Sequence, residues 1–230
     1  MTSAQRKMLI IGLVPVLVLV VTAAALTVSM IRGRLPYSYS ASYAPGPKGV
    51  KVVSDVSLQL LASSDGQVHV TVDGTYAVAQ PSVKVATAGG VLDVETGCPD
   101  VHCEVEVTVE VPGTSAVQVK AEGTSMDAVG VASPLTVEAN DGSITLTRVR
   151  SSRVSVDAVH GSVDMLFDSA PDQVNATASG GSLTVQVPRT TTYAIDALAA
   201  QGSTQIDIPN DSSSSNRLYL RTSYGSITVQ

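Results

Sequence analysis

From residue 50 onward, hydrophobic and polar residues alternate along the chain with a period of two. The clearest case runs from Val105 to Val111, where valines alternate with glutamate and threonine until Pro112 interrupts the pattern. Such alternation is typical of a β-strand that buries one face and exposes the other. Turn residues such as Ser64-Asp65-Gly66 separate the alternating segments. The pattern predicts one repetitive all-β domain over residues 50–230.

A second and longer period begins at Leu135. Gly-Ser pairs recur every 19 to 23 residues, and hydrophobic residues stand at the same offsets from each glycine. A strand, a glycine turn and a second strand form a unit that buries its inner face only when copies stack. Glycine is needed at such a turn where a Cβ would clash or where φ is positive. The turn glycines of the repeat are Gly142, Gly161, Gly181, Gly202 and Gly225.

The aligned repeats favour a β-solenoid, a β-helix-like domain in which each coil pairs with the equivalent parts of its neighbours. An antiparallel β-sandwich is the alternative, because short strands separated by turns are also expected there. An earlier pair, Gly123-Thr124, fits the spacing, but Val117 and Val119 before it are displaced by one position. Unpaired strand edges at the end of a stack, where the chain finishes on residues 226–230, would also allow a homo-oligomer.

The hydrophobic pattern near the N-terminus is of a different kind. Residues 8–31 contain no charged side chain, and at about 1.5 Å per residue they are long enough to cross a bilayer. A cleaved signal peptide is the alternative, because residues 23–25 are alanines, but its apolar core would be shorter. We expect a cytoplasmic stub at 1–7, a transmembrane helix at 8–31 in contact with membrane lipid, and a proline-containing linker at 32–49.

The two cysteines of the chain, Cys98 and Cys103, lie close together in the predicted β domain. An even pair in a soluble module favours a disulfide formed in an oxidising compartment, which places this domain outside the cell membrane as part of a single-pass protein. A zinc site is the alternative, because Asp100 and His102 lie between the thiols. No second cluster of ligands accompanies them, so we expect the disulfide and neither a metal nor a cofactor.

Charge and aromatic content narrow the choice of partners. All 20 acidic residues follow residue 34, as do 10 of the 14 basic residues, so the part after residue 34 has a formal charge of −10. We therefore expect no nucleic-acid partner. Aromatic platforms for sugars or peptides are scarce, with one phenylalanine, seven tyrosines and no tryptophan. The exposed strand positions that we single out for binding are Thr145, Asp164, Thr184 and Thr228.

Catalytic signatures are lacking in the sequence. His160 lies beside Gly161-Ser162 and three residues after Asp157, but the members of a Ser-His-Asp triad come from separate segments, and no GxSxG motif is present. In the repeat alignment, His160 occupies a turn position, where a solvated side chain is expected. We therefore predict no catalytic residue and a protein that is not an enzyme.

The glycine-punctuated strands of about residues 50–230 and the Cys98–Cys103 block leading into the strand at 105–112 resemble a bacterial family known as "putative adhesins". This family is a domain of unknown function built from repetitive β-strands and often carried behind a membrane anchor. The resemblance implies an adhesin-like interaction surface on the cell envelope, with an unknown envelope or protein partner. The alternative function is a sensor or regulatory partner of another membrane protein, and a hydrolase that uses dispersed carboxylates ranks third.

Overall fold

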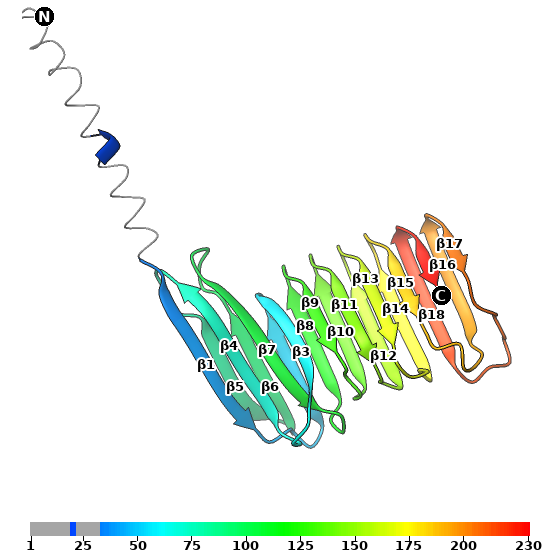
Figure 1. The fold of residues 1–230 in the computed structure, drawn as a ribbon, viewed down its shortest axis with the longest axis horizontal. Helices are drawn as coiled ribbons and strands as arrows, with labels where there is room; N and C mark the ends of the chain where they lie inside the picture. Colours follow the sequence, from blue (N-terminus) through cyan, green and yellow to red (C-terminus); the bar gives the residue numbers. More distant parts are fainter. Residues whose placement is uncertain (1–18, 22–32) are drawn as a thin grey trace, which may run out of the picture. The chain divides into compact units, whose positions relative to one another are not determined.

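The computed structural model describes residues 19–21 and 33–230. Residues 37–230 form one compact unit of β-strands arranged in two sheets (Figure 1). Sheet A has ten strands in the spatial order β1 (Leu35–Tyr43), β4 (Val68–Tyr76), β7 (Glu104–Pro112), β3 (Ser57–Ser63), β9 (Met126–Val129), β11 (Ile144–Val149), β13 (Val163–Phe167), β15 (Leu183–Gln186), β19 (Ile227–Val229) and β17 (Thr204–Ile206). Sheet B has nine, in the order β16 (Ala194–Gln201), β18 (Arg217–Tyr224), β14 (Gln173–Ala178), β12 (Arg153–Ala158), β10 (Leu135–Asn140), β8 (Val117–Glu122), β2 (Gly49–Ser54), β6 (Val91–Gly97) and β5 (Ser82–Ala88).

Neighbouring strands are mostly parallel, because each belongs to a successive coil. In each repeat coil, a strand of sheet B leads through a glycine turn into a strand of sheet A, as β10 leads into β11. Strand β10 pairs in parallel with both β8 and β12, which aligns Leu135 with Val117 and Val154. The β-solenoid prediction is therefore confirmed. The antiparallel sandwich is wrong, because the repeat coils pair in parallel, and the antiparallel pairs β4·β7 and β5·β6 lie toward the N-terminal end of the stack.

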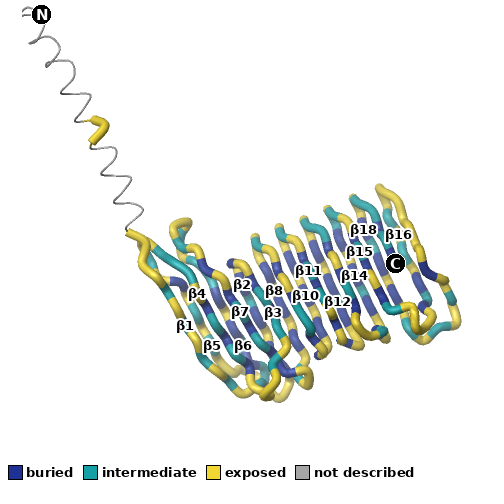
Figure 2. The backbone as a smooth tube through the Cα atoms, in the orientation of Figure 1, coloured by how far each residue is buried: buried dark blue, intermediate teal, exposed yellow. Residues whose placement is uncertain are grey.

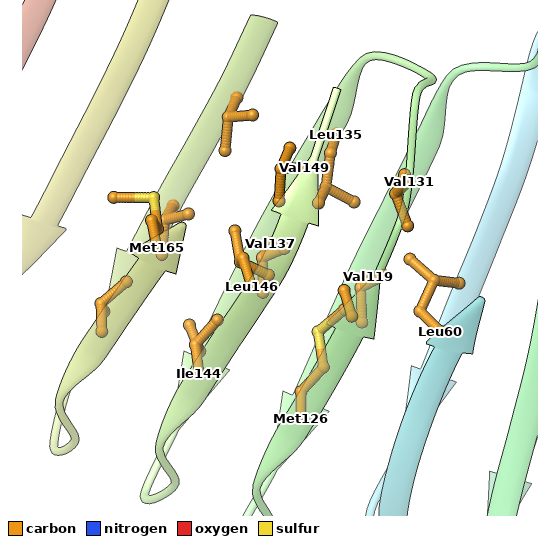
Figure 3. Packing of buried hydrophobic residues seen from close by; sticks show 14 of the residues in the cluster. Leu60, Val119, Met126, Val131, Leu135, Val137, Ile144, Leu146, Val149 and Met165 are labelled. Atoms are coloured by element: carbon orange, nitrogen blue, oxygen red, sulfur yellow. The ribbon is translucent and has the colours of Figure 1, made fainter. Parts of the chain in front are cut away.

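The core lies between the two sheets and is made by the inward positions of the alternating pattern. Figure 2 shows buried and exposed residues alternating along the strands. In Figure 3, Val119 and Val137 of sheet B lie opposite Met126, Ile144 and Leu146 of sheet A. All five are at most 2% exposed. Burial of apolar side chains from both sheets is the main force that holds the coils together.

The spatial order of the last two coils differs from their order in the sequence. Strand β18 pairs with β14 on one side and with β16 on the other, and β19 likewise lies between β15 and β17. The C-terminal strands are thus inserted one coil into the stack. The expectation of an exposed C-terminal coil at residues 226–230 is wrong, because Ile227 and Val229 are fully buried and β16 and β17 form the edges.

The segment predicted to be a linker, residues 32–49, contains a strand and the start of another. Residues 35–43 form β1, the edge of sheet A next to β4, and β2 begins at Gly49. Tyr37, Tyr39 and Tyr43 pack against the core from this strand. The linker prediction is therefore wrong for residues 35–43, because alternate tyrosines give this strand an apolar face that closes one end of the stack.

The predicted transmembrane helix at 8–31 lies outside the described residues apart from 19–21, as does the stub at 1–7. Within the described part of the chain, no helix has both the length and the apolar character needed to span a bilayer.

Candidate interaction surface

The repeat glycines form a column of close backbone contacts at one corner of the coils. A Cβ built on Gly161 would overlap with the backbone oxygen of Gly142, and a Cβ on Gly181 would overlap with that of Gly161. Gly225 stacks on Gly181, and Gly202 stacks on Gly225, in agreement with the inserted coil. Of these five glycines, only Gly225 has a positive φ, at 137°. Close approach between coils, rather than left-handed backbone, is therefore the main reason for glycine here.

The one-residue displacement around Gly123 has a structural explanation. Ala121 and Glu122 align with Ala139 and Asn140, so that Thr124 rather than Gly123 takes the position beneath Gly142. Gly123 instead matches Asp141, and both adopt positive φ values, 66° and 58°. The earlier repeat thus places its glycine at the left-handed position of the turn, and the later repeats place theirs at the crowded one.

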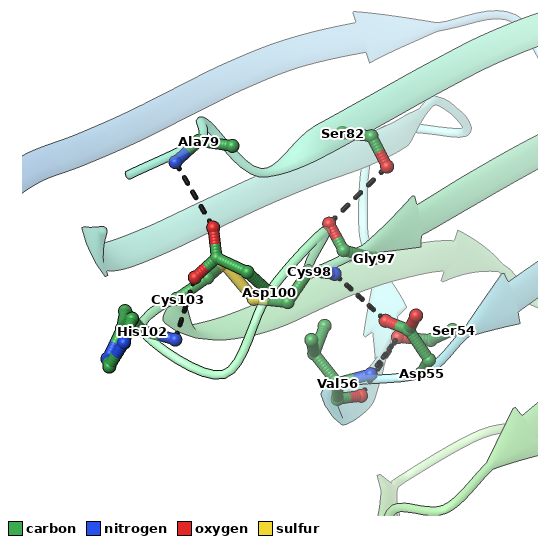
Figure 4. The surroundings of a disulfide bond; sticks show 10 residues. All are labelled: Ser54, Asp55, Val56, Ala79, Ser82, Gly97, Cys98, Asp100, His102 and Cys103. Carbon is green, nitrogen blue, oxygen red and sulfur yellow. Dashed lines mark hydrogen bonds between the residues drawn. A yellow bond between two sulfur atoms is a disulfide. The ribbon is translucent and has the colours of Figure 1, made fainter. Parts of the chain in front are cut away.

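The predicted disulfide between Cys98 and Cys103 is present, with the two Cα atoms 5.6 Å apart (Figure 4). The carboxylate of Asp100 accepts hydrogen bonds from the backbone amides of His102 at 2.7 Å and Ala79 at 3.2 Å. The Asp55 carboxylate accepts from the amide of Cys98 at 3.0 Å. These contacts tie the loop to its neighbours, and the disulfide removes both thiols from the set of metal ligands. The described residues hold no cluster of three metal-ligating side chains.

The four residues singled out in the sequence form one row across the outer face of sheet A, where Asp164 is exposed and the three threonines are half-buried. Thr145 aligns with Asp164, Asp164 with Thr184, and Thr184 with Thr228. The row continues from Thr145 to Asp127 on the other side. The structure therefore brings these residues together as a polar strip, and no aromatic side chain belongs to this row.

A Ser-His-Asp chain of hydrogen bonds, which the sequence did not reveal, joins β1 to the β3–β4 turn. The Ser42 hydroxyl lies 2.8 Å from Nδ1 of His69, and Nε2 of His69 lies 2.9 Å from the Asp65 carboxylate. Hydrogen bonds from the Gln67 amide, His69 and Ser63 lower the pKa of Asp65 to about 2. Ser42 and Asp65 are exposed to solvent, whereas catalytic serines lie in a substrate cleft. We interpret these hydrogen bonds as a structural link that attaches the edge strand β1 to the β3–β4 turn.

Exposed apolar side chains gather on sheet B at the end of the stack formed by β16 and β18. Leu198 is 57% exposed and Tyr219 is 45% exposed. Asp196 aligns with Tyr219, and Leu198 aligns with Arg221, on the outer face of these two strands. We call Asp196, Leu198, Tyr219 and Arg221 the end patch.

The charged side chains of the end patch hold one another in place. The Arg221 guanidinium carbon lies 3.8 Å from the ring centroid of Tyr219, and a guanidinium nitrogen lies 2.7 Å from the Asp196 carboxylate. The hydrogen bond to Asp196 raises the pKa of Arg221 above its usual value. A hollow of about 290 Å³ adjoins the patch and includes Asn210, Arg217 and Tyr219 in its lining. The patch thus combines an aromatic ring, an aliphatic side chain and a neutralised ion pair.

The repeat alignment carried a signal for the end patch that sequence reasoning missed. Four residues before each turn glycine, the outward position holds Glu138, Asp157, Thr177, Leu198 and Arg221. Leu198 is the one large apolar side chain in this outward series. Its exposure follows from the alternation, but its proximity to Tyr219 depends on the insertion of β18 beside β16.

A model of the Toastrack DUF4097 family matches residues 54–230. A structure named putative cell adhesion protein, from Clostridium sporogenes, has 14% sequence identity and a TM-score of 0.51, covering 85% of this chain and 99% of that chain. A putative adhesin from Bacteroides fragilis has 13% identity and a TM-score of 0.46, covering 84% and 97%. No curated protein matches the chain.

Proposed function

Because this chain belongs to the Toastrack DUF4097 family, we propose that it is a non-enzymatic, adhesin-like protein of the cell envelope that binds a partner protein through its end patch. The family match confirms the resemblance to adhesin-like domains of unknown function that the strand pattern indicated. The name of the Clostridium sporogenes structure supports the adhesion part of the proposal. Anchoring by residues 8–31 is part of the same proposal and rests on the apolar run in the sequence.

The observation that carries the proposal is the exposure of Leu198 and Tyr219 on the outer face of two neighbouring strands, β16 and β18. Tyrosine and arginine are enriched at the centres of protein interfaces, where a rigid ring buries a large area at a low entropy cost. Arg221 already pairs with Asp196, so a partner need not supply a charge for it. By contrast, the polar row through Thr145 offers no comparable apolar anchor.

The binding test uses the full chain in lipid nanodiscs, added to intact cells of the organism that encodes it. We expect saturable binding that falls more than tenfold for the double variant Leu198→Ala/Tyr219→Ala, because each interface anchor contributes about 2 kcal/mol. Treating the cells with protease should abolish the binding if the partner is a protein. The matched control, Thr145→Ala/Thr184→Ala, changes the outer face of sheet A and should leave binding unchanged.

Two results would overturn this assignment. Equal loss of binding in both double variants would place the partner elsewhere, and full binding to protease-treated cells would exclude a protein partner. Circular dichroism of each variant verifies that the sheets remain folded.

The membrane arrangement is tested separately in cells that produce the full chain. We expect the chain to stay in the membrane fraction after alkaline carbonate extraction, and its β domain to be digested by protease added outside the cells. Release of the chain into the soluble fraction would count against the anchor. Protection of the β domain in intact cells would reverse the proposed orientation.

A further inference from the structure

Strand β11 contains an extra residue relative to the next coil, and this residue is an arginine. Leu146 aligns with Met165 and Val149 aligns with Phe167, so two residues of β11 stand opposite one residue of β13. Arg148 is one of these two and has a φ of 53°. Residues other than glycine, asparagine and aspartate rarely adopt this left-handed backbone conformation, because their Cβ then crowds the backbone. The bulge therefore holds Arg148 in a conformation with a steric cost.

The preceding coil shows that glycine fits the same position. Thr147 aligns with Val129, so that Arg148 follows in register with Gly130, whose φ is 70°. The Gly130 amide donates to the Thr147 oxygen at 2.9 Å, and the Arg150 amide donates to the Val131 oxygen at 2.8 Å. The two coils therefore share one backbone path, and one uses glycine where the other uses arginine. Bulges often serve to direct a side chain toward a functional site.

The hollow beside the bulge is lined by basic, acidic and apolar side chains. It has a volume of about 410 Å³, and Leu61, Val129, Arg148, Arg150 and Asp168 belong to its lining. A guanidinium nitrogen of Arg150 donates to the Gly130 oxygen at 3.1 Å, which fixes this side chain at the rim. Among the described residues, the Arg148 side chain has no hydrogen bond or ion pair, and Asp168 forms an ion pair with neither arginine.

We propose that the hollow between Arg148 and Arg150 binds a phosphate-bearing organic ligand, with its phosphate on the two guanidinium groups and its organic part over Leu61 and Val129. Paired guanidinium groups match the oxygens of a phosphate, and such charge-assisted hydrogen bonds are about twice as strong as neutral ones. The formal charge of −10 after residue 34 repels anions in general, so that binding depends on this local pair. This site lies apart from the end patch and is independent of the function proposed above.

The test uses the full chain in nanodiscs and phenyl phosphate as the probe, observed by phosphorus NMR line broadening. We expect saturable broadening at millimolar phenyl phosphate and weaker broadening with inorganic phosphate. Phenol or benzoate, added as a competitor, should leave the broadening of phenyl phosphate unchanged. Arg148→Ala should weaken binding at least tenfold, because it removes a charge-assisted hydrogen bond of about 1.5 kcal/mol or more. Asp168→Asn should tighten binding, since it removes the negative charge from the lining.

Arg148→Gly separates a binding role from a structural one. It should lose binding as Arg148→Ala does, but with a higher temperature of unfolding, because glycine adopts positive φ without steric cost. Arg153→Ala, which removes an exposed arginine from sheet B, is the matched charge control and should bind normally. Unchanged binding by Arg148→Gly, equal competition by benzoate, or no broadening with the wild-type chain would each overturn the proposal.

Discussion

At the turn glycines of the repeat, neighbouring coils lie so close together that a Cβ has no room. Each turn glycine of the column lies against the carbonyl group of the coil beside it, and a methyl group there would force the coils apart. A substitution at one turn glycine therefore also disturbs the pairing of the strands on either side of the turn.

Replacing Gly161 with alanine should destabilise the domain by about 3 kcal/mol, because the added Cβ meets the backbone oxygen of Gly142 and backbone cannot move aside cheaply. Denaturant unfolding measures the loss. The control is Gly113→Ala, whose Cβ would make an ordinary contact at 3.4 Å with the Cβ of Ala132. A shift of more than about 0.5 kcal/mol in the control would show that the loss reflects glycine replacement in general.

Tyr39 should make the stability of the domain depend on pH in the alkaline range. Its hydroxyl lies 2.5 Å from that of Tyr43, and this hydrogen bond is the main cause that raises the pKa of Tyr39 from 10.0 to about 12. A raised pKa means that the folded state holds the proton more tightly, so the stabilisation is complete below about pH 10 and is lost toward about pH 12. Denaturant unfolding over this range should show the decline, and Tyr39→Phe should reduce it. An identical pH profile for the variant would contradict the assignment.

At the scale of elements, the position of a strand in the stack decides how much its side chains contribute to the stability of the domain. Ile206 and Ile227 both lie in the second strands of their repeats, four and two residues after the respective turn glycines. Ile227 lies in β19, between β15 and β17, and is fully buried. Ile206 lies in β17, at the edge, and is 37% exposed.

Truncation of these two isoleucines therefore tests the inserted order of the last coils. Ile227→Ala should cost about 4 kcal/mol and Ile206→Ala about 1 to 2 kcal/mol, since the cavity term applies only where neighbours surround the side chain on both sides. The measurement is equilibrium unfolding of each variant. If the coils stacked in sequence order, the larger cost would fall on Ile206.

The disulfide affects one loop rather than a whole sheet. Cys98 and Cys103 are five residues apart, so closing the loop restricts the unfolded chain only modestly. Replacing both with serine should lower the free energy of unfolding by about 2 kcal/mol. The wild-type protein in reducing agent should show the same loss, and a much larger effect would mean that the loop also holds β6 and β7 together.

Across the whole molecule, both ends of the stack are covered by side chains that differ from those of the middle coils. At one end, the rings of Tyr37 and Tyr76 pack edge to face with centroids 6.3 Å apart. At the other end, the side-chain amide of Asn210 bonds to both the amide and the carbonyl of Ile195, at 2.9 and 3.0 Å, as a neighbouring strand would. Thr204 replaces the apolar residue found at this position in the interior coils, as expected for a terminal repeat.

Asn210→Ala should expose the edge of β16 and promote self-association. We expect a loss of about 1 to 2 kcal/mol from the two hydrogen bonds, together with a higher apparent mass in sedimentation velocity as unpaired strand edges meet. Ser212→Ala, in the same loop, serves as the control and should sediment like the wild type. A monomeric Asn210→Ala protein with reduced stability would show that Asn210 stabilises β16 without preventing association.

The sequence alone determined the strand period, the coil period and the turn glycines, because inward side chains recur every two residues and close contacts between coils admit only glycine. The sequence also predicted the disulfide, since the two cysteines lie close together and no second cluster of metal ligands accompanies them. The insertion of β18 and β19 was decided by tertiary structure, because repeats with similar apolar faces can stack in more than one order.

The tertiary structure also decided which outward residues become neighbours. Leu198 and Tyr219 are 21 positions apart in the sequence and share one patch only because β16 and β18 pair. Likewise, the tyrosines of β1 have the composition of a linker, and their role in closing the core depends on the strand beside them. Local periodicity fixes which face of a strand is buried, but contacts between distant strands fix what each exposed face can bind.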